Sequence, residues 1–312
     1  MPEIDILLAS YNGEKYIAEQ IESILSQTFT DWRLLIRDDG SSDNTPAIIE
    51  SYAEKYPGKI EVVHDDKGGG NLVKNFFELL GHAEADYVMF CDQDDYWLPE
   101  KIRITLERMK EAEYENPDTP VMIFTGLELT DEKLRSMKKF MAVSIAEFLY
   151  TFDCLIISNC VSGCTEMLNR PLYSNIGEWS ENISCLHDHW TAIYASAFGT
   201  VCHVSQALVL YRQHSGNQVG RTGYGGGRKY FRVVRGYMKR LKKFLDIRRT
   251  NTYFRQRYSK SMPPTKLKQL DDFLSLMKSG RFRRLIILLT GKYPLKCSLF
   301  YKIKLIMKCV LM

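Results

Sequence analysis

The segment FCDQDDYWLPEKI, residues 90–102, places three carboxylates directly behind an apolar run. The run YVMF at 87–90 has the composition of a buried strand, and Asp92, Asp94 and Asp95 follow it. Two carboxylates about 5 Å apart repel each other by roughly 3 kcal/mol at an effective dielectric constant near 20. A fold tolerates this cost where the cluster faces water or where a cation lies between the charges. The segment therefore predicts one of these two settings at a strand end.

Apolar runs and helical patterns alternate on both sides of this segment. Strands are expected at 4–9, 32–39, 59–66 and 85–92, and helices at 15–27, 41–56, 71–83 and after Pro99. Because the connections are short, this alternation predicts a parallel sheet with helices on both faces. Further along, we expect a strand at 121–129, a turn into a helix at 160–170, a helix at 185–199 and a pair of strands at 200–214.

Polar residues gather where three of the predicted strands end. Ser10-Tyr11-Asn12, Asp38-Asp39-Gly40 and Asp92 to Asp95 all follow apolar runs. Sheets of this kind bind their ligands at the carboxyl ends of the strands. We therefore expect these residues to form one functional edge, although a merely solvated acidic rim would have the same composition.

The charge of the chain is divided unevenly. Among 312 residues, 45% are hydrophobic and 12% aromatic, which excludes a disordered chain. Residues 221–312 contain 25 Lys and Arg and three acidic residues, which leaves 17 of the 42 basic and 35 of the 38 acidic residues before them. This boundary predicts two parts with different partners, at 1–219 and 220–312.

The sequence has the features expected of a cytoplasmic protein. The N-terminal MPEIDILLAS contains acidic residues and no basic region, unlike a secretory signal. No uncharged span of about 20 apolar residues occurs. The eight cysteines lack CxxC pairs, so we expect reduced thiols packed in the core.

Six ordered motifs resemble those of the family 2 inverting glycosyltransferases with the GT-A fold, especially their bacterial rhamnosyltransferase-like members. They are LLASYNGEKYIAEQIESILSQTF (7–29), LLIRDDGSSDNT (34–45), MFCDQDDYWLPEKI (89–102), SGCTEMLNR (162–170), LHDHW (186–190) and LYRQHSGN (210–217). The resemblance covers about residues 3–219. It implies a Rossmann-like, mostly parallel sheet flanked by helices, with a nucleotide-sugar half at about 1–100 and an acceptor half at about 101–219. The remainder, 220–312, would be a basic, mainly helical extension.

The resemblance also implies a metal site. In this family the acidic motif after the fourth strand coordinates a divalent cation that holds the diphosphate of the donor. It thus implies Mn²⁺ or Mg²⁺ bound by Asp92, Asp94 and His214, with Asp92 also near the ribose. Hard cations favour such oxygen ligands. Asp95 would cap a helix or support the ligands.

The acidic cluster also has two interpretations that depend on the residues alone. The aspartates could cap the helix that opens near Pro99. A calcium loop of the helix–loop–helix type fits poorly, because its fifth position would be Tyr96 and no glycine follows at the sixth.

The residues that the resemblance assigns to the donor are Ala9, Tyr11, Asp39, Lys74, Asp92 and Arg212. Asp39 matches an aspartate that accepts a hydrogen bond from the pyrimidine N3–H, which favours a UDP- or dTDP-sugar. Tyr11 would pack on the pyrimidine ring and Arg212 would meet a phosphate. Asp38 is expected to support the turn, and Lys74 could equally be an ordinary exposed lysine.

Asp188 in LHDHW matches the catalytic base of the family. This carboxylate takes the proton from the acceptor hydroxyl while that oxygen attacks the anomeric carbon, and the configuration inverts. His187 stands where glutamate is common, so the group that orients Asp188 is left open. Asp188 could instead be a helix-terminal charge that the helix dipole stabilises. A zinc site formed by His187 and His189 is disfavoured, because residues two apart on a helix face different directions.

The basic region favours a membrane partner. Residues 228–249 carry an apolar helical stripe among many Lys and Arg, which predicts peripheral attachment to an anionic membrane surface. The region could instead dock on the acidic part, and no recognised module supports nucleic-acid binding. The glycine-rich 215–229 could close over a diphosphate or serve as a linker.

Together with the resemblance, these features predict an enzyme of bacterial surface-polysaccharide assembly at the inner face of the cell membrane. It would transfer a sugar from a UDP- or dTDP-sugar to a lipid-linked glycan acceptor. A nucleotidyltransferase of the same fold would be expected to have a phosphate loop rich in Gly, Arg and Lys after the first strand, where this chain has SYNGEKY. A non-catalytic scaffold is a further alternative, against which Asp92, Asp94 and Asp188 argue.

Overall fold

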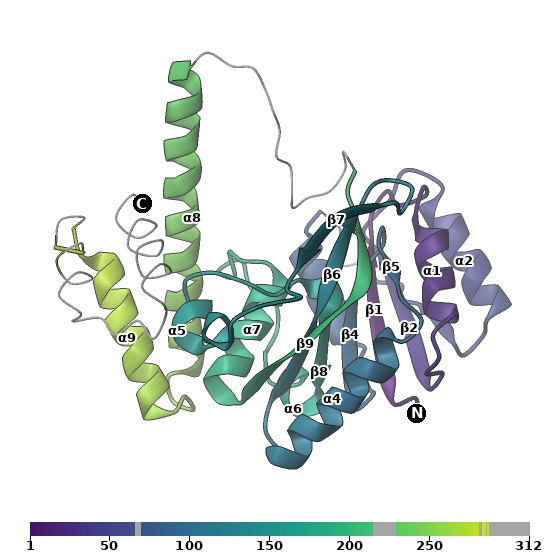
Figure 1. The fold of residues 1–312 in the computed structure, drawn as a ribbon, viewed down its shortest axis with the longest axis horizontal. Coiled ribbons are helices and arrows are strands. Elements are labelled where there is room, and N and C mark those ends of the chain that lie inside the picture. The colour runs from purple at the N-terminus through teal and green to yellow at the C-terminus, as the bar shows by residue number, and fades with distance from the viewer. Residues whose placement is uncertain (66–69, 215–228, 281–282, 285, 287–312) are drawn as a thin grey trace. The chain divides into compact units, whose positions relative to one another are not determined.

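The computed structural model describes residues 1–65, 70–214, 229–280, 283–284 and 286 (Figure 1). The described residues belong to two compact units that alternate along the chain. The first unit comprises 1–145, 160–179 and 199–220, and the second comprises 146–159, 180–198 and 221–312. The charge boundary near residue 220 therefore marks only the last passage from one unit to the other.

The first unit is built on a nine-stranded sheet with the order β3-β2-β1-β4-β8-β6-β9-β5, and β7 pairs with β6. The strands are β1 Ile4–Ser10, β2 Trp32–Asp38, β3 Ile60–Val62, β4 Tyr87–Asp92, β5 Tyr96–Trp97, β6 Val121–Thr130, β7 Ser136–Met141, β8 Glu166–Asn169 and β9 Thr200–Arg212. The sheet is flanked by helices, so the α/β fold class is confirmed.

The first four strands are parallel, as predicted. β1 pairs with both β2 and β4, and β2 pairs with β3. Ala9 lies opposite Arg37 on one side and Asp92 on the other. This register brings the carboxyl ends of β1, β2 and β4 to one edge of the sheet (Figure 1).

The rest of the sheet is mixed, which the prediction of a parallel sheet did not include. β8 is antiparallel to β4 and β6, β5 to β9 and β7 to β6, whereas β6 and β9 are parallel. The predicted pair of strands at 200–214 is wrong, because 200–212 forms the single strand β9. Its polar Ser205 and Gln206 fall within a register shift opposite Thr125 and Gly126, so they form a bulge and not a turn.

Helices cover both faces of the sheet. The α-helices of the first unit are α1 Ile17–Leu25, α2 Thr45–Lys55, α3 Leu72–Leu80, α4 Lys101–Glu115 and the short α6 Arg170–Tyr173. Ile6 and Leu8 of β1 share one core with apolar residues of α1, α2 and α4. On the opposite face, Phe90 of β4 meets Phe76 of α3 with ring centroids 5.2 Å apart. This arrangement buries β1 and β4 on both faces and fixes the strand ends that carry the polar residues.

Segment 160–170 contains a strand that the sequence did not reveal. After the 3₁₀ turn η2 Gly163–Thr165, β8 inserts between β4 and β6 before α6 begins at Arg170. The expected turn into a helix is present, but only after these four extended residues.

The second unit is helical. It contains η1 Glu147–Tyr150, α5 Phe152–Leu155, α7 His187–Phe198, α8 Lys229–Tyr258 and α9 Pro264–Lys278. Its core is aromatic: Trp190 meets Phe254 at 5.3 Å and Phe254 meets Tyr258 at 4.8 Å between ring centroids. Helix α7 confirms the prediction for 185–199.

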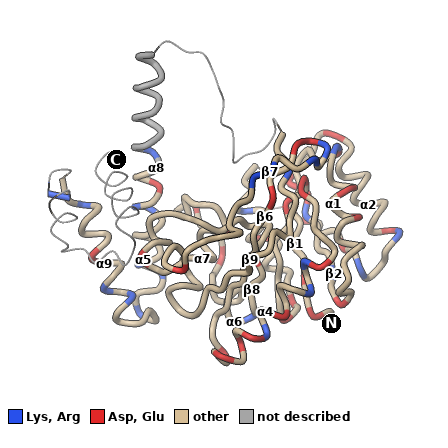
Figure 2. Tube along the Cα trace, in the orientation of Figure 1, with Lys and Arg blue, Asp and Glu red and all other residues tan. Residues whose placement is uncertain are grey.

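Basic residues recur along the described parts of α8 and α9 (Figure 2). Within the described residues, no helix combines the length and the apolar character that a membrane crossing requires. Residues 287–312 and most of the predicted glycine-rich loop lie outside the described residues. The six described cysteines are reduced, and Cys91, Cys154, Cys164 and Cys202 are buried as expected.

Candidate active site

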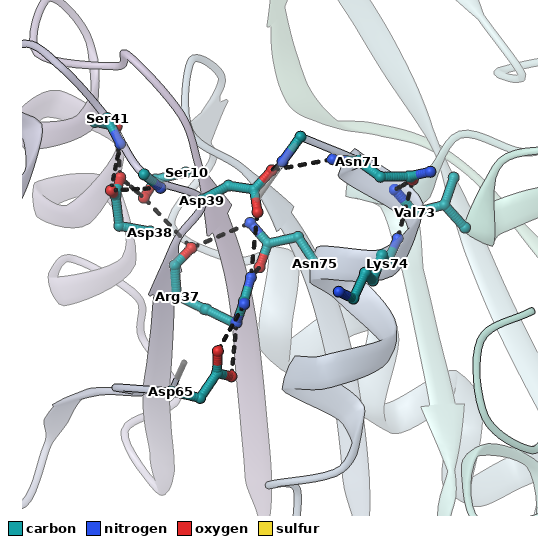
Figure 3. A network of polar contacts seen from close by, with 12 residues as sticks. Ser10, Arg37, Asp38, Asp39, Ser41, Asp65, Asn71, Val73, Lys74 and Asn75 are labelled. Atoms are coloured by element: carbon teal, nitrogen blue, oxygen red, sulfur yellow. Dashed lines mark hydrogen bonds and ion pairs between the residues drawn. The ribbon is translucent and has the colours of Figure 1, made fainter. Parts of the chain in front are cut away.

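Asp38, the last residue of β2, organises the turn that follows it. Its carboxylate accepts hydrogen bonds from the Ser10 hydroxyl at 2.9 Å and the Ser41 hydroxyl at 2.6 Å (Figure 3). The backbone N–H groups of Gly40 and Ser41 donate to it at 3.1 and 2.7 Å. Gly40 has φ +84°, a conformation that favours glycine. The predicted role of Asp38 in the turn is confirmed.

Asp39 has a side chain that is only 8% exposed, and it ties β2 to the start of α3. It accepts hydrogen bonds from the N–H groups of Gly70 at 2.7 Å and Asn71 at 3.2 Å. The Arg37 guanidinium donates to its other oxygen at 3.3 Å and also to Asn75 at 3.1 Å (Figure 3). These contacts hold the Asp39 carboxylate in one place at the sheet edge.

Arg37 extends this network away from the edge. Its guanidinium forms two hydrogen bonds with the Asp65 carboxylate, at 2.7 and 2.9 Å. Beside it, a cavity of 460 Å³ is lined by Arg37, Asp38, Gly40 and Asp65 together with residues of α2 and the end of β3. Its volume lies within the range of small-molecule sites.

Tyr11 follows β1 with its side chain 53% exposed, so its ring is accessible. Its backbone N–H donates to Gln93 Oε1 at 2.8 Å, and Gln93 Nε2 donates to its carbonyl at 2.9 Å. A Cβ atom on Gly13 would lie 2.3 Å from Gln93 Oε1, so a side chain at position 13 would displace the Gln93 amide. Gln93 thus joins the ends of β1 and β4. Gln93 was not among the predicted site residues, although it lies within the DQDD segment.

The other two assigned residues at this edge are Ala9 and Lys74. Ala9 is buried near the end of β1, opposite Asp92. Lys74 is half-buried in the first turn of α3, which Asn71 caps by accepting from the N–H groups of Val73 and Lys74. Both positions are compatible with contacts to the sugar-nucleotide donor, and these contacts remain predictions.

Two of the predicted metal ligands lie in direct contact. Asp94 Oδ2 is 2.7 Å from Nε2 of His214, although 120 positions separate them in the chain. The His214 ring lies against Tyr16, with centroids 4.8 Å apart. The fold therefore brings the end of β9 to the acidic segment after β4.

Asp95 is fully buried below this pair. Its Oδ1 accepts a hydrogen bond from the Arg212 N–H at 3.2 Å. Possible ligand atoms of Asp92, Asp95 and Cys164 lie within 4.8 Å of one another. Burial, and then the charges of Asp94 and Asp92, raise the pKa of Asp95 well above its ordinary value.

The burial of these aspartates removes two interpretations of the acidic cluster. The cluster is not a solvated rim, because Asp95 is fully buried and the Asp94 side chain is only 18% exposed. It is not a helix cap either, because the N-cap residue of α4 is Glu100. Of the two roles expected for Asp95, the helix cap is therefore wrong, and support of the metal ligands stays a prediction.

Lys101 supplies a buried positive charge near the cluster. Its side chain is fully buried, and Nζ lies 3.2 Å from the centre of the Trp97 ring. Burial lowers its pKa to about 7, while Cys164, Cys91 and Asp95 act in the opposite direction. A partly ionised lysine offsets only part of the negative charge of the acidic cluster.

The Arg212 side chain is buried and directed at protein groups. Its guanidinium donates to the carbonyl groups of Asp94 at 2.8 Å and Glu132 at 2.6 Å, and to the Glu19 carboxylate at 2.5 Å. It also lies over the Tyr16 ring, 4.6 Å from the centroid. In this arrangement Arg212 braces the acidic segment, and its predicted contact with a phosphate gains no support.

Asp188 belongs to the second unit, where it is the second residue of α7. It is buried, and its Oδ1 accepts a hydrogen bond from the His189 N–H at 2.6 Å. His187 is buried beside it, and burial lowers the pKa of His187 to about 3, so this imidazole is neutral at pH 7. The His189 ring instead lies 2.5 Å from the Leu155 carbonyl. Asp188 suits both a catalytic base and a helix-terminal charge.

The chain resembles known proteins in both its sequence and its fold. The model of the family described as "Glycosyl transferase family 2" matches residues 5–177. The dTDP-rhamnosyl transferase RfbG of Shigella flexneri is 28% identical over 225 residues, which are 68% of this chain and 73% of that protein. The putative teichuronic acid biosynthesis glycosyltransferase TuaG of Bacillus subtilis is 30% identical over 215 residues, 68% and 79% of the two chains.

Two solved structures have a similar fold. TarS 1–349 of S. aureus in complex with UDP-GlcNAc has a TM-score of 0.57 at 19% identity and aligns over 99% of this chain and 89% of its own. The mannosyltransferase PcManGT of Pyrobaculum calidifontis, in complex with GDP-Man and Mn²⁺, has a TM-score of 0.58 at 13% identity, over 99% and 85%. The expected GT-A architecture is thereby confirmed.

Proposed function

The chain belongs to glycosyl transferase family 2, and we propose that it is a metal-dependent inverting enzyme of bacterial surface-polysaccharide assembly. It transfers a hexose or deoxyhexose from a UDP- or dTDP-sugar to a lipid-linked glycan acceptor. The enzyme works at the inner face of the cell membrane and binds the anionic membrane surface without crossing it. The name of TuaG, which refers to teichuronic acid biosynthesis, supports the polysaccharide setting.

The contact between Asp94 and His214 is the observation that carries the proposal. Carboxylate oxygens with one imidazole suit Mn²⁺ or Mg²⁺, and Asp92, Asp94 and His214 would hold the ion. Cys164 also lies beside Asp92 and Asp95, but Mn²⁺ and Mg²⁺ prefer oxygen ligands to the soft thiolate, so the Cys164 thiol is not assigned to the ion. When bound, the ion supplies Lewis-acid stabilisation of the leaving diphosphate.

Asp39 is the residue proposed to select the base of the donor. A carboxylate accepts from the N3–H of uracil or thymine, whereas cytosine has no hydrogen at N3. The contacts with Gly70, Asn71 and Arg37 hold this carboxylate at the sheet edge, where the half-exposed Tyr11 ring could pack on the base. RfbG and TarS are named with pyrimidine nucleotides, whereas PcManGT is named with GDP-Man. Donor selection is therefore a property to test on this chain.

Asp188 is proposed as the general base. It removes the proton from the acceptor hydroxyl as this oxygen attacks the anomeric carbon. The bond to the nucleoside diphosphate breaks on the opposite face, so the configuration inverts. The neutral His187 beside Asp188 adds no positive charge that would compete for the carboxylate.

Release of nucleoside diphosphate tests the proposal without knowledge of the acceptor, because water can replace it slowly. The purified chain is incubated with UDP-, dTDP- and GDP-sugars, with and without Mn²⁺. We expect Mn²⁺-dependent release from one pyrimidine donor, and its loss in Asp94→Asn and Asp188→Asn.

The matched control is Asp118→Asn. This aspartate is exposed and has φ +58°, which asparagine tolerates, so the control should behave as the wild type. Hydrolysis that is independent of metal would refute the metal requirement. Failure of every nucleotide to bind would favour a non-catalytic scaffold.

A further inference from the structure

The second unit contains a cavity of 540 Å³ between residues near Asn182 and the described side chains of α8. Most of the residues that line it are polar by type, with Asp246, Arg248, Arg249 and Gln256 beside Asn182, whereas the surface they expose together with Leu245 and Tyr253 is mainly apolar. Its volume is that of a typical small-molecule site. None of these residues has a role in the donor and metal site described above.

Interactions within the unit fix the walls of this cavity. Arg249 Nε donates to Asn182 Oδ1 at 3.2 Å, and the Ser184 N–H donates to the Thr250 hydroxyl at 3.1 Å. The Tyr253 ring is stacked on the buried Trp190, with centroids 5.9 Å apart and planes 28° apart. The 180–184 segment and α8 are thus joined around the cavity.

The lining has the chemistry of a carbohydrate site with an anionic group. Planar amide, carboxylate and guanidinium groups can each hydrogen-bond neighbouring hydroxyls, and Tyr253 offers an apolar face to a sugar ring. Two guanidinium groups face a single carboxylate, so the net charge of the lining is positive. Guanidinium forms its strongest paired hydrogen bonds with carboxylates and phosphates.

The thiol of Cys185 relates this cavity to Asp188. Burial, and then the charge of Asp188, raise the pKa of Cys185 to about 12, and Asp246 of the cavity wall adds to this effect. Geometry makes the same connection, because Trp190 follows Asp188 by two residues on α7 and stacks on Tyr253 of the cavity wall.

We propose that this cavity binds the glycan acceptor, and that the bound sugar carries a carboxylate or a phosphate. The inference rests on the proposed function, because it takes Asp188 as the base that must stand beside the acceptor. It adds the chemical class of the acceptor and assigns Arg248 and Arg249 to its anionic group.

Ligand-detected NMR with the full chain tests this inference. The three probes are methyl glucoside, methyl glucuronide and glucose 6-phosphate, so a neutral sugar, a carboxylate and a phosphate are compared. We expect at least one anionic probe to bind about tenfold more tightly than the neutral one. The Arg248→Gln/Arg249→Gln variant should lose this preference, whereas Lys133→Gln, an exposed charge in the first unit, should keep it.

The outcomes separate this inference from the proposed function, because donor hydrolysis by the wild type is measured in parallel. Equal binding of neutral and anionic probes, or an unchanged preference in the double variant, refutes the anionic acceptor. No probe binding with intact donor hydrolysis refutes the cavity as the acceptor site and leaves the function standing. Selective probe binding without binding or hydrolysis of any donor supports an anionic-sugar site but refutes the enzyme function. Whichever anionic probe binds more tightly identifies the acceptor group as carboxylate or phosphate.

Discussion

The two acidic strand ends of the first unit accommodate their charges in different ways. After β2, Asp38 and Asp39 together accept hydrogen bonds from two hydroxyl groups, four backbone N–H groups and one guanidinium. After β4, Asp94 meets His214 and the buried Asp95 accepts one backbone N–H, while Arg212 points at the Asp94 carbonyl and not at a carboxylate of the cluster. The protein therefore surrounds the carboxylates after β2 with hydrogen-bond donors, whereas after β4 it places several hydrogen-bond acceptors close together.

This difference shows that an acidic motif at a strand end is not by itself a metal site. Hydrogen-bond donors stabilise an ionised carboxylate, so the protein alone stabilises the two carboxylates after β2, without a cation. Carboxylates that share a buried space must instead gain a cation or bind protons. The sequence after each acidic pair differs accordingly. GSS follows Asp39 and provides hydrogen-bond donors for Asp38, whereas YW follows Asp95 and contains neither glycine nor serine.

Asp94→Asn should have the largest effect, because it removes a charge at the strand end that has fewer donors. We expect Mn²⁺-dependent release of nucleoside diphosphate to fall by about 10²- to 10³-fold, as for the loss of one preorganised charge-stabilising group. Calorimetric titration with Mn²⁺ should show weaker binding as well. Unchanged Mn²⁺ affinity in the variant would mean that the β4 end needs no ion at Asp94, and the contrast with β2 would fail.

Asp39→Asn should affect the nucleotide and not the ion. Losing a hydrogen bond to a charged group costs about 1.5–3 kcal/mol, which is roughly a 10- to 100-fold weaker affinity for UDP. The asparagine amide can donate to N3 of cytosine, so the preference for UDP over CDP should also narrow. Equilibrium binding of UDP and CDP measures both effects. If the preference for UDP persists in full, another residue reads the base.

Asp38→Ala should lower stability while leaving Mn²⁺ affinity unchanged. It removes the acceptor of four hydrogen bonds in the turn after β2, for which we expect a loss of about 2 kcal/mol and a decrease in Tm of about 5 °C. Differential scanning calorimetry measures the change, and Asp118→Asn is the surface control. A large loss of Mn²⁺ binding in this variant would show that the two strand ends are not independent.

The sequence was sufficient to predict what depends on local pattern. The strands β1, β2 and β4 are long and apolar, and their polar ends fall where parallel pairing places them. The convergence of Asp94 and His214 came from a family resemblance, since no periodicity links positions 120 apart.

Features that depend on tertiary structure left no local signal. The strands β5, β7 and β8 are short or fully exposed, so no periodicity marks them. Arginine is a residue type that commonly binds phosphate, but the Arg212 guanidinium is oriented by its hydrogen bonds to Glu19 and to carbonyl groups of distant segments. Cys164 becomes a neighbour of Asp95 only because β8 inserts beside β4.

The smallest effect concerns the pH dependence of stability at the β4 end. Burial and the neighbouring aspartates raise the pKa of Asp95 above its ordinary value of 3.8, so the folded chain retains a proton that the unfolded chain has lost. In the absence of a divalent ion, this group therefore lowers stability as pH rises from 3.8 through its folded pKa.

Asp95→Asn removes this dependence and keeps an oxygen for the Arg212 N–H. Between about pH 5 and 8 the variant should be more stable than the wild type in urea unfolding with EDTA. The buried Lys101, with its pKa lowered to about 7, favours the folded state as pH rises, so it does not reverse this difference. Parallel pH profiles for the two proteins would show that the Asp95 charge is already compensated without an ion, and the contrast between the two strand ends would lose its physical basis.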